Sequence, residues 1–333
     1  NGGARLMIIS KTPLRISFAG GGSDLKAYYQ TGCGSVVSTA IDKFMYVTVN
    51  KTFDHHVRVI YSKAEYVENI EDIEHNLARE ALKLVGITKG GLDIVYMGDM
   101  LPAHAGSGLG ASSSLTVGIL NAIYALKGQR VSARTLAEEA CQIEIEVLGR
   151  PIGKQDQYSA AYGGLNYIQF DNDESVFVEP IICSKETKNQ LAKDLLLFYT
   201  GMNTKSDTIL TEQQGKISDN LPILDKMVGL SDELRKVLIN NDLAEFGNML
   251  HKGWICKQKL ASKITNSLIN DYYEKAREAG AIGGKILGSG GGGFLLLYCQ
   301  EQNQNKVREV LSDLREAPFN FELEGSKIIY CSD

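Results

Sequence analysis

The chain has 333 residues, of which 44% are hydrophobic and 23% are charged, and its formal net charge is −5. This length favours two domains of ordinary size with a folded core, and an acidic balance without a basic stripe argues against nucleic acid as a partner. No run of about 18 apolar residues is present that could cross a membrane, and no secretory signal opens the sequence, so we expect a cytoplasmic protein; the oligomeric state leaves no signature in the sequence.

Alternating and helical hydrophobic patterns predict strands and helices along the whole chain. The expected strands are Met7–Phe18, Val36–Asn50, His56–Tyr61, Leu92–Met97, Leu165–Phe170, Leu195–Tyr199, Phe294–Cys299 and Ser326–Tyr330. The expected helices are Glu74–Val85, Ala111–Leu126, Ala133–Leu148, Thr208–Val228, Asp232–Leu238, Leu243–Leu260, Ser267–Ala279 and Asn303–Leu314. Pro13 is expected to break the first strand or place it at an edge, and the next two strands suggest a meander. We place a boundary near residue 185, between α+β domains at 1–185 and 186–333.

Glycine and cysteine are both informative. The 34 glycines gather in three clusters, at Gly20–Gly22, Gly106–Gly110 and Gly288–Gly293. Glycine permits a close approach to backbone and positive φ angles, so three such clusters predict a ligand site lined by backbone. The six cysteines are scattered without a CxxC pair, which favours reduced thiols over disulfides or zinc.

The strongest local signal is the glycine-rich segment Pro102–Ser114, which follows a predicted strand and leads directly into a predicted helix. Free N–H groups and the dipole at a helix start favour an anion, and the serines at 112–114 add hydroxyl donors or a metal ligand. A Walker loop is excluded because the segment has no lysine. Gly106, Gly108 and Ala111 match G-x-G-x-x-A, but the compact strand–turn–helix context of dinucleotide-binding folds is missing. The alternative is a glycine-rich turn with an ordinary capping serine.

One glutamate on the helix expected at Ala133–Leu148 faces the wrong way for a surface residue. At about 100° per residue, one apolar stripe is predicted. Its members are Leu136, Ala140, Ile143 and Val147, continued by Ala133, Ala137 and Leu148. Glu144 falls inside this stripe, whereas Glu146 falls on the polar side. A buried carboxylate is costly unless it is paired or bound to a cation, so Glu144 is either a metal ligand or the partner of a nearby arginine or lysine.

The turn that follows this helix contains Asp156. A carboxylate close to a phosphate site can orient or deprotonate an attacking hydroxyl. The alternative is an N-cap for the short helix expected at Gln157–Tyr162. From the turn alone, the capping role is the better explanation.

Together these segments resemble the GHMP kinase superfamily, which includes galactokinase, homoserine kinase, mevalonate kinase and phosphomevalonate kinase. Three motifs occur in the family's order, at Pro13–Asp24, Gly106–Ser114 and Lys285–Gly293. Residues Glu144–Gln157 also resemble the galactokinase pattern E-x-E-x-x-G-x-P-x-G-x-x-D-Q. The resemblance runs from residue 11 to about residue 300. It implies a two-domain α+β fold, with an N-terminal domain like part of ribosomal protein S5 and a ferredoxin-like C-terminal domain.

The resemblance also implies a role for individual residues, with ATP and Mg²⁺ as cofactors. The residues expected to bind the ATP phosphates are Gly106, Ser107, Gly108, Leu109, Gly110, Ala111, Ser112 and Ser113. Ser112 and Glu144 would hold Mg²⁺. Asp156 matches the family's catalytic aspartate, and Arg15 matches the basic residue that pairs with it and with the transferred phosphoryl group. The third motif would pack against the phosphate loop and close the site.

The first motif bears on the substrate. Galactokinases have Glu-His where this chain has Gly21 and Gly22, although Asp24, which binds sugar hydroxyls in galactokinases, is retained. The G-G-G-S-D form instead resembles the bacterial D-glycero-D-manno-heptose 7-phosphate kinases and, more loosely, the kinase part of fucokinases. These enzymes phosphorylate the anomeric hydroxyl. The implied partner is therefore a small sugar or sugar phosphate.

The residues expected to bind this substrate are Gly21, Gly22, Ser23, Asp24, Gly288, Ser289, Gly290 and Gly291. Candidate cations for a sugar phosphate are Lys11, Lys26, Lys154 and Lys205, each of which is otherwise an ordinary surface lysine. Two alternatives stay open. One is a kinase for another sugar, such as fucose, galactose or an N-acetylhexosamine, and the other is a nucleotide- and sugar-binding regulator that has lost its chemistry.

Overall fold

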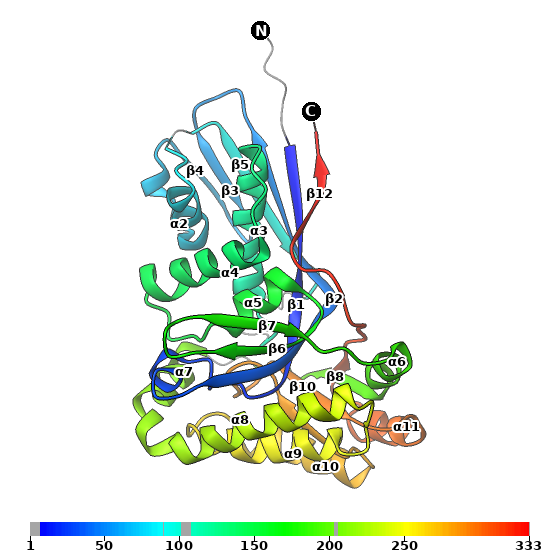
Figure 1. Cartoon of the computed structure of the whole chain (residues 1–333). Helices are drawn as coiled ribbons and strands as arrows, with labels where there is room; N and C mark the ends of the chain where they lie inside the picture. Colours follow the sequence, from blue (N-terminus) through cyan, green and yellow to red (C-terminus); the bar gives the residue numbers. More distant parts are fainter. Residues whose placement is uncertain (1–6, 89, 101–107, 203–205, 333) are drawn as a thin grey trace.

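A long antiparallel strand pair forms the centre of the first half of the molecule (Figure 1). The computed structural model describes residues 7–88, 90–100, 108–202 and 206–332. In it, β1 (Met7–Ala19) pairs with β2 (Gly34–Lys51) over most of its length. They belong to an eight-stranded sheet of order β12-β1-β2-β5-β3-β4, in which β6 also pairs with β2, and β7 pairs with β6.

The remaining elements of this half surround the β1–β2 pair. The strands are β3 (Val57–Ile60), β4 (Ala64–Val67), β5 (Leu92–Gly98), β6 (Leu165–Phe170), β7 (Val176–Pro180) and β12 (Lys327–Cys331). The helices are α1 (Lys26–Tyr29), α2 (Asn76–Leu84), α3 (Ala111–Leu126), α4 (Ala133–Cys141) and α5 (Gln155–Tyr162), with a 3-10 turn η1 (Ile70–Asp72) and a π-helical turn η2 (Gln142–Val147). Helix α3 packs across β1 and β2 and also contacts α5, so its N-terminus lies close to the first motif.

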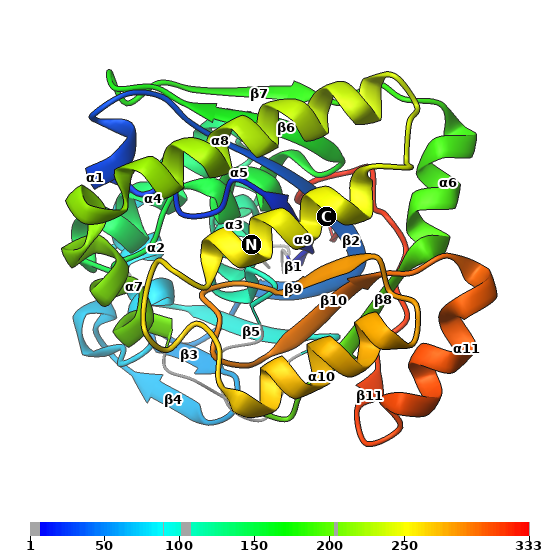
Figure 2. The same cartoon turned by 90° about the horizontal axis from the view of Figure 1, so that it is seen from below.

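The second half contains a four-stranded antiparallel sheet of order β11-β8-β10-β9 (Figure 2). Its strands are β8 (Leu195–Tyr199), β9 (Gly283–Ile286), β10 (Phe294–Tyr298) and β11 (Arg315–Glu316). Its helices are α7 (Ser206–Gly215), α8 (Ile217–Ile239), α9 (Phe246–Lys257), α10 (Ser267–Glu278) and α11 (Glu301–Val310), and α6 (Lys185–Asp194) leads into it. Helices separate β8 from β9 and β10 from β11, which is a ferredoxin-like order. The predicted α+β fold is confirmed.

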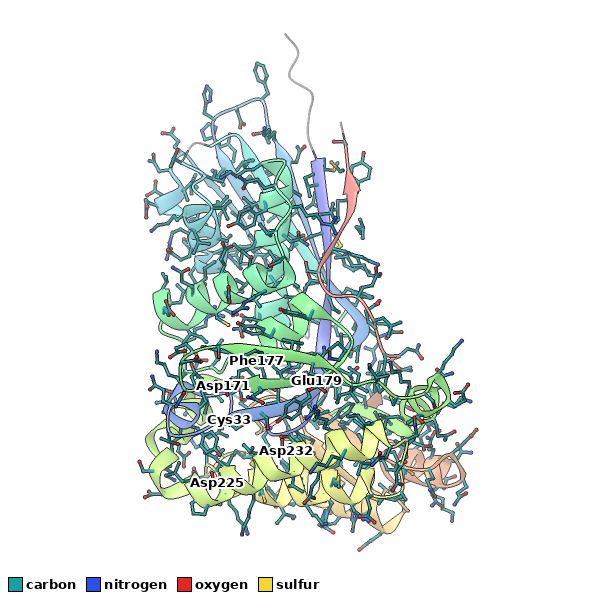
Figure 3. All side chains as sticks on the ribbon, in the orientation of Figure 1. Cys33, Asp171, Phe177, Glu179, Asp225 and Asp232 are labelled. Carbon is teal, nitrogen blue, oxygen red and sulfur yellow. The ribbon has the colours of Figure 1, made fainter. Side chains whose placement is uncertain are left out.

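The two halves are joined by more than the connecting chain. Strand β12 returns from the second half and pairs with β1, beside which it lies in Figure 1. Helix α8 is tied to the first half by two tyrosines: Tyr28 donates to Asp225 over 2.7 Å, and Tyr167 donates to Asp232 over 2.6 Å. Figure 3 labels both aspartates along α8, which lies below the β6–β7 hairpin in this view. The boundary near residue 185 stays a prediction, but the unit expected at 186–333 includes a strand of the first sheet.

Two expectations about strands are corrected. Strands β2 and β3 do not form a meander, because β5 lies between them and pairs in parallel with β3. Parallel neighbours need a crossover, and α2 supplies it. Pro13 lies inside an unbroken β1, at a point where the register with β2 shifts, and such an irregularity lets proline enter a strand. Among the helices that the structure describes, none is long and apolar enough to cross a membrane.

Candidate active site

Buried Arg15 and partly exposed Asp156 form a bidentate ion pair at the meeting point of β1, α3 and α5. The Arg15 Nε donates to Asp156 Oδ1 over 2.7 Å, and Nη2 donates to Oδ2 over 2.8 Å. The remaining Arg15 Nη1 donates to the Gly108 carbonyl over 2.6 Å, and the Arg15 backbone N–H donates to the Leu109 carbonyl over 3.0 Å. Such bidentate pairs are geometrically specific. Arg15 therefore fixes the catalytic candidate Asp156 and the phosphate-loop candidates at the same time.

Helix α3 begins beside this ion pair. Its N-cap is Gly110, with φ +74°. A Cβ atom at Gly110 would lie 3.2 Å from Arg15 Cγ and 3.4 Å from Asp156 Oδ2. The start of a helix attracts anions through its N–H groups and dipole. An anion bound there would therefore meet Asp156 and Arg15 directly.

Glu144 is fully buried beside the first turn of α3. Ser112 Oγ donates to its Oε1 over 2.8 Å, Gln157 Nε2 donates to its Oε2 over 2.8 Å, and Arg150 Nη1 lies 2.9 Å from Oε1. Burial raises the pKa of the Glu144 carboxyl, while the hydrogen bond from Ser113 and the charge of Arg150 oppose that rise. The arginine partner that the sequence left open thus exists, and it lies beside the hydroxyl expected to hold a metal.

The helix that carries Glu144 ends in a π-helical turn. The Leu148 N–H donates to the Ile143 carbonyl over 3.0 Å, five residues back instead of four. Because this turn is wider, the apolar stripe predicted at a constant 100° per residue is wrong at its end: Val147 is 52% exposed. Glu144 lies within this turn but is buried, as the helical spacing predicts, while Glu146 is exposed.

The three serines of α3 divide between two environments. Ser112 and Ser113 direct their hydroxyls to Glu144. Ser114 instead donates to the Pro13 carbonyl over 2.8 Å and is fully buried. The expectation that all three hydroxyls serve a ligand is therefore wrong for Ser114, which attaches α3 to β1. Gly106 and Ser107, which were expected to bind ATP, lie outside the described residues.

The first motif forms a turn organised by Ser23 and Asp24. Ser23 Oγ donates to the Gly20 carbonyl over 2.8 Å, and Asp24 accepts from the Gly22 N–H over 2.9 Å and from the Gln155 N–H over 3.3 Å. Both side chains are buried, and this desolvation raises the pKa of Asp24. The Ser23 hydroxyl holds the turn, and a role of Ser23 in substrate binding stays a prediction. Asp24 links the first motif to the turn before Asp156.

The third motif lies directly against the phosphate-loop segment. A Cβ atom at Gly288 would lie 2.4 Å from Gly108 Cα, and one at Gly108 would lie 2.5 Å from the Leu287 carbonyl oxygen. Only glycine permits this backbone contact between segments 180 residues apart. Gly290 and Gly291, expected to bind substrate, are buried; Gly290 lies against Ile264, and the Gly291 N–H donates to the Ile264 carbonyl over 2.7 Å. Gly288 and Ser289 remain partly exposed.

Residues 66–164 match the family described as GHMP kinases N terminal domain, and residues 234–317 match GHMP kinases C terminal. The chain belongs to the GHMP kinase family. It is 28% identical over 339 residues to the D-glycero-alpha-D-manno-heptose 7-phosphate kinase of Campylobacter jejuni, covering 96% of this chain and 98% of that one. It is 25% identical over 327 residues to the bifunctional fucokinase/GDP-fucose pyrophosphorylase of Arabidopsis thaliana, covering 91% of this chain and 31% of that one.

A solved structure shows the same relationship. A D-glycero-D-manno-heptose 1-phosphate kinase from Bacteroides thetaiotaomicron superposes with a TM-score of 0.80 at 25% identity, over 97% of this chain and 99% of that one. As a GHMP kinase, this protein is a phosphotransferase with an alcohol group as acceptor, and within the family it is a sugar kinase. ATP is the phosphoryl donor of this family.

Replacing a glycine at the contact between the two motifs provides a test of this GHMP kinase. Gly288→Ala is expected to lower the unfolding midpoint and raise the KM for ATP, because the new Cβ clashes with Gly108 and φ is +68°. A left-handed conformation alone costs about 1–2 kcal/mol for a residue with a side chain, so we expect a roughly tenfold rise in KM. Gly253→Ala is the control, because nothing lies within 4 Å of a Cβ there and α9 gains a better helix former. Equal behaviour of the two variants would contradict the expectation.

Two buried lysines were missed from the sequence. Lys257 on α9 donates to the Ile286 carbonyl over 3.2 Å and also to the Gly288 carbonyl. Lys285 on β9 donates to the Ser17 carbonyl over 2.8 Å. Lys257 therefore attaches the third motif to α9, and Lys285 attaches the first motif to β9. Lys257 could have been found by the spacing that found Glu144, since it follows the buried Leu250 and Trp254 at helical intervals.

The buried amine of Lys257 makes stability depend on pH. Burial, and secondarily the charge of Arg15, lowers its pKa from 10.5 to about 7. Between these values the unfolded chain binds more protons, so this group adds a contribution to the free energy of unfolding that rises with pH and is constant below about 7. The difference between wild type and Lys257→Met in urea unfolding should increase from about pH 6 to about pH 9. Lys252→Met, at an exposed position on the same helix, should show no such increase; parallel curves for both variants would refute the prediction.

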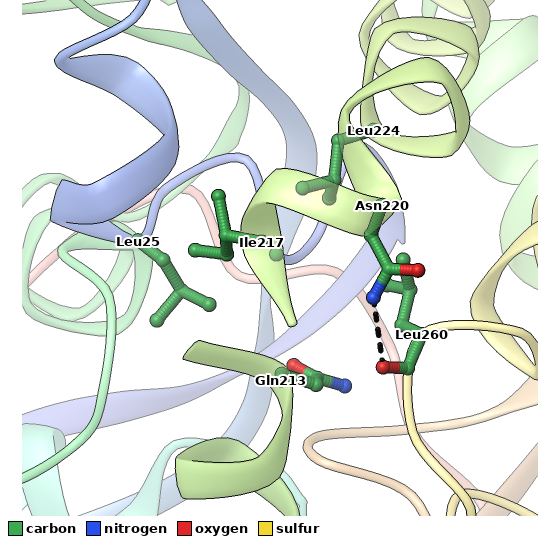
Figure 4. Close-up of a pocket in the computed structure, with 7 residues that line it drawn as sticks. Leu25, Gln213, Ile217, Asn220, Leu224 and Leu260 are labelled. Atoms are coloured by element: carbon green, nitrogen blue, oxygen red, sulfur yellow. Dashed lines mark hydrogen bonds between the residues drawn. The ribbon is translucent and has the colours of Figure 1, made fainter. Parts of the chain in front are cut away.

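A small cavity adjoins the first motif (Figure 4). It lies between Gly22, Leu25 and the start of α8, and its volume is about 10 Å³. Such a volume holds about one water molecule. Asn220 spans one side by donating to the Leu260 carbonyl over 3.0 Å. The cavity is therefore too small for a sugar in this conformation.

Proposed function

We propose that this GHMP kinase transfers the terminal phosphoryl group of ATP to the anomeric hydroxyl of D-glycero-D-manno-heptose 7-phosphate, with Mg²⁺ at Ser112 and Glu144. One observation carries the proposal: Arg15 holds Asp156 by a bidentate pair at the start of α3, the anion-binding end of that helix. A phosphoryl acceptor and a phosphate group would meet at this point. In-line transfer needs little besides such positioning and neutralisation of charge.

The residues around Glu144 fit a magnesium ion. Mg²⁺ prefers hard oxygen ligands and is usually held by one or two protein groups together with substrate phosphates. A fully buried carboxylate beside a serine hydroxyl at the helix start supplies that donor set. When bound, the ion would neutralise charge on the phosphates. Within the residues that the structure covers, no group of three or more His, Cys, Asp and Glu side chains could hold a metal by itself, so phosphate oxygens would complete the shell.

Each remaining side chain of the site has a role derived from its contacts. Asp156 orients the acceptor hydroxyl and can accept its proton, and Arg15 holds this carboxylate in place. The N–H groups at the start of α3 stabilise charge that develops on the transferred group. Asp24 holds the first motif against the turn before Asp156, and we expect the sugar to bind on this side of the site.

The choice of substrate is supported by the similarity to the D-glycero-alpha-D-manno-heptose 7-phosphate kinase of Campylobacter jejuni, which extends over nearly the whole chain. Two of the four candidate lysines for a sugar phosphate lie together: Lys26 and Lys154 lie 2.8 Å and 2.5 Å from Glu174. Lys11 lies over the Phe44 ring at 3.6 Å, away from the first motif's turn, and Lys205 is outside the described residues. Lys26 and Lys154 flank Asp24 and its hydrogen-bonded turn.

A panel of acceptors with ADP release as the readout tests the proposal. We expect turnover with D-glycero-D-manno-heptose 7-phosphate, and the product's loss of a free anomeric hydroxyl can be followed by NMR. Higher kcat/KM with fucose, galactose or an N-acetylhexosamine would assign another sugar and overturn the substrate. Absence of ADP formation with saturating ATP, Mg²⁺ and every acceptor would favour a regulator without chemistry.

A further inference from the structure

The backbone after the π-helical turn returns Arg150 to the buried carboxylate. Gly149 adopts φ +62°, and the Arg150 N–H donates to the Glu144 carbonyl over 3.0 Å. This closes the end of the helix and directs the arginine side chain back toward α3. The backbone conformation thus places the Arg150 guanidinium beside Glu144, and the Arg150 side chain is only 25% exposed.

Arg150 contacts the same two atoms that a magnesium ion would use. Its Nη1 donates to Glu144 Oε1 over 2.9 Å and to Ser112 Oγ over 2.5 Å. A Mg²⁺ ion needs ligand oxygens at about 2.0–2.1 Å. One nitrogen that already lies between both oxygens occupies that place. The guanidinium and the ion therefore exclude one another at these atoms.

The ion pair between Arg150 and Glu144 has fewer hydrogen bonds than the ion pair between Arg15 and Asp156. Arg15 uses two nitrogens on two oxygens of Asp156, whereas Arg150 uses one nitrogen on one oxygen of Glu144. Its Nη2 donates to Asn76 Oδ1 over a longer distance of 3.5 Å. Bidentate pairs are the strong arrangement, so the two arginines differ in how readily they can be displaced.

Because Glu144 is fully buried, its ionised carboxylate requires a compensating cation. An uncompensated carboxylate in the protein interior is strongly destabilising. We propose that Arg150 is an exchangeable counter-ion of the Glu144–Ser112 site: it neutralises the carboxylate before nucleotide binds and is displaced by the divalent cation that arrives with ATP. This inference rests on the proposed metal role of Ser112 and Glu144. It explains how a metal-binding carboxylate stays buried without its metal.

The exchange predicts weak binding of a divalent cation to the nucleotide-free protein. Arg150→Met removes the competing charge, so it should bind Mn²⁺ at least about tenfold more tightly, which corresponds to about 1.4 kcal/mol. Free Mn²⁺ is measured by electron paramagnetic resonance without nucleotide. The variant should also unfold at a lower temperature than wild type, with a larger rise on adding Mg²⁺. Arg134→Met is the matched control, since Arg134 pairs with Glu138 on the surface of α4 and should change neither quantity.

Two further measurements keep the test decisive. Arg150→Gln is neutral but can still donate to Glu144, so it provides the same comparison if the Met variant does not fold. Equal or weaker Mn²⁺ binding by the neutral variants than by wild type would overturn the counter-ion inference. Mn²⁺ binding in the presence of a non-hydrolysable ATP analogue is measured in parallel. If Glu144→Gln abolishes this binding while the Arg150 variants bind Mn²⁺ as wild type does, only the counter-ion inference fails. If Glu144→Gln leaves this binding unchanged, the proposed metal site fails.

Discussion

Asp156→Asn is expected to lower kcat by about 10²–10⁴-fold, the range that a positioned acid or base contributes. Asparagine keeps the size of the side chain but cannot act as a base. Its NH₂ group would also replace one of the two oxygens that accept hydrogen bonds from Arg15. ATP affinity should be retained, because Arg15 still holds Gly108 through Nη1. Steady-state turnover by ADP release and binding of a fluorescent ATP analogue measure the two effects.

The control for this variant is Asp173→Asn, at an exposed position in the turn between β6 and β7. It should leave kcat unchanged. Thermal unfolding of both variants separates a catalytic loss from a folding defect. Turnover of Asp156→Asn at the wild-type level would remove Asp156 from the mechanism and leave it as part of the ion pair that orders the loop.

Glu144→Gln should produce the second large loss, of at least about 10²-fold in turnover at ordinary Mg²⁺ concentration, because stabilisation of charge by a bound metal is worth several kcal/mol. Glutamine can still accept from Ser112, so the local structure is preserved. Rising Mg²⁺ should restore part of the activity, since the phosphates continue to supply ligands. The measurement is turnover as a function of Mg²⁺ concentration at fixed ATP.

Glu139→Gln is the matched control. Glu139 lies on the preceding helix, is half-buried, and accepts from Tyr124 over 2.6 Å without contact to Ser112. Burial raises the pKa of Glu139 as it does that of Glu144, but the two carboxylates have different hydrogen-bond partners. The same Mg²⁺ dependence in Glu144→Gln and wild type would show that Glu144 is only the partner of Arg150.

Local patterns were sufficient for much of the secondary structure. Helix α3 and strands β6 and β8 have the predicted bounds, and Ser132 caps α4 by accepting from the Thr135 N–H over 3.0 Å. These features depend on neighbours in the chain, where hydrophobic period and capping act. The burial of Glu144 belongs to the same class, because helical spacing alone places it on the apolar face.

Other features depend on residues that are remote in sequence. Strand β12 pairs with β1 and covers a sheet edge that would otherwise present unpaired backbone groups, but no local pattern identifies β1 as its partner. Lys257 is a similar case in the site: its spacing marks it as buried, but its carbonyl partners lie 29 and 31 residues away.

The sequence by itself therefore determined which residue types gather in this protein: a glycine-lined helix start, a buried glutamate and an aspartate in the next turn. Only the tertiary structure decided how they act together. Arg15 and Asp156 are 141 residues apart and meet because α3 and α5 pack on β1. Arg150 reaches Glu144 because a π-helical turn changes the period that the sequence pattern assumes. Contacts between distant segments arise from packing and backbone geometry, which a one-dimensional pattern does not encode.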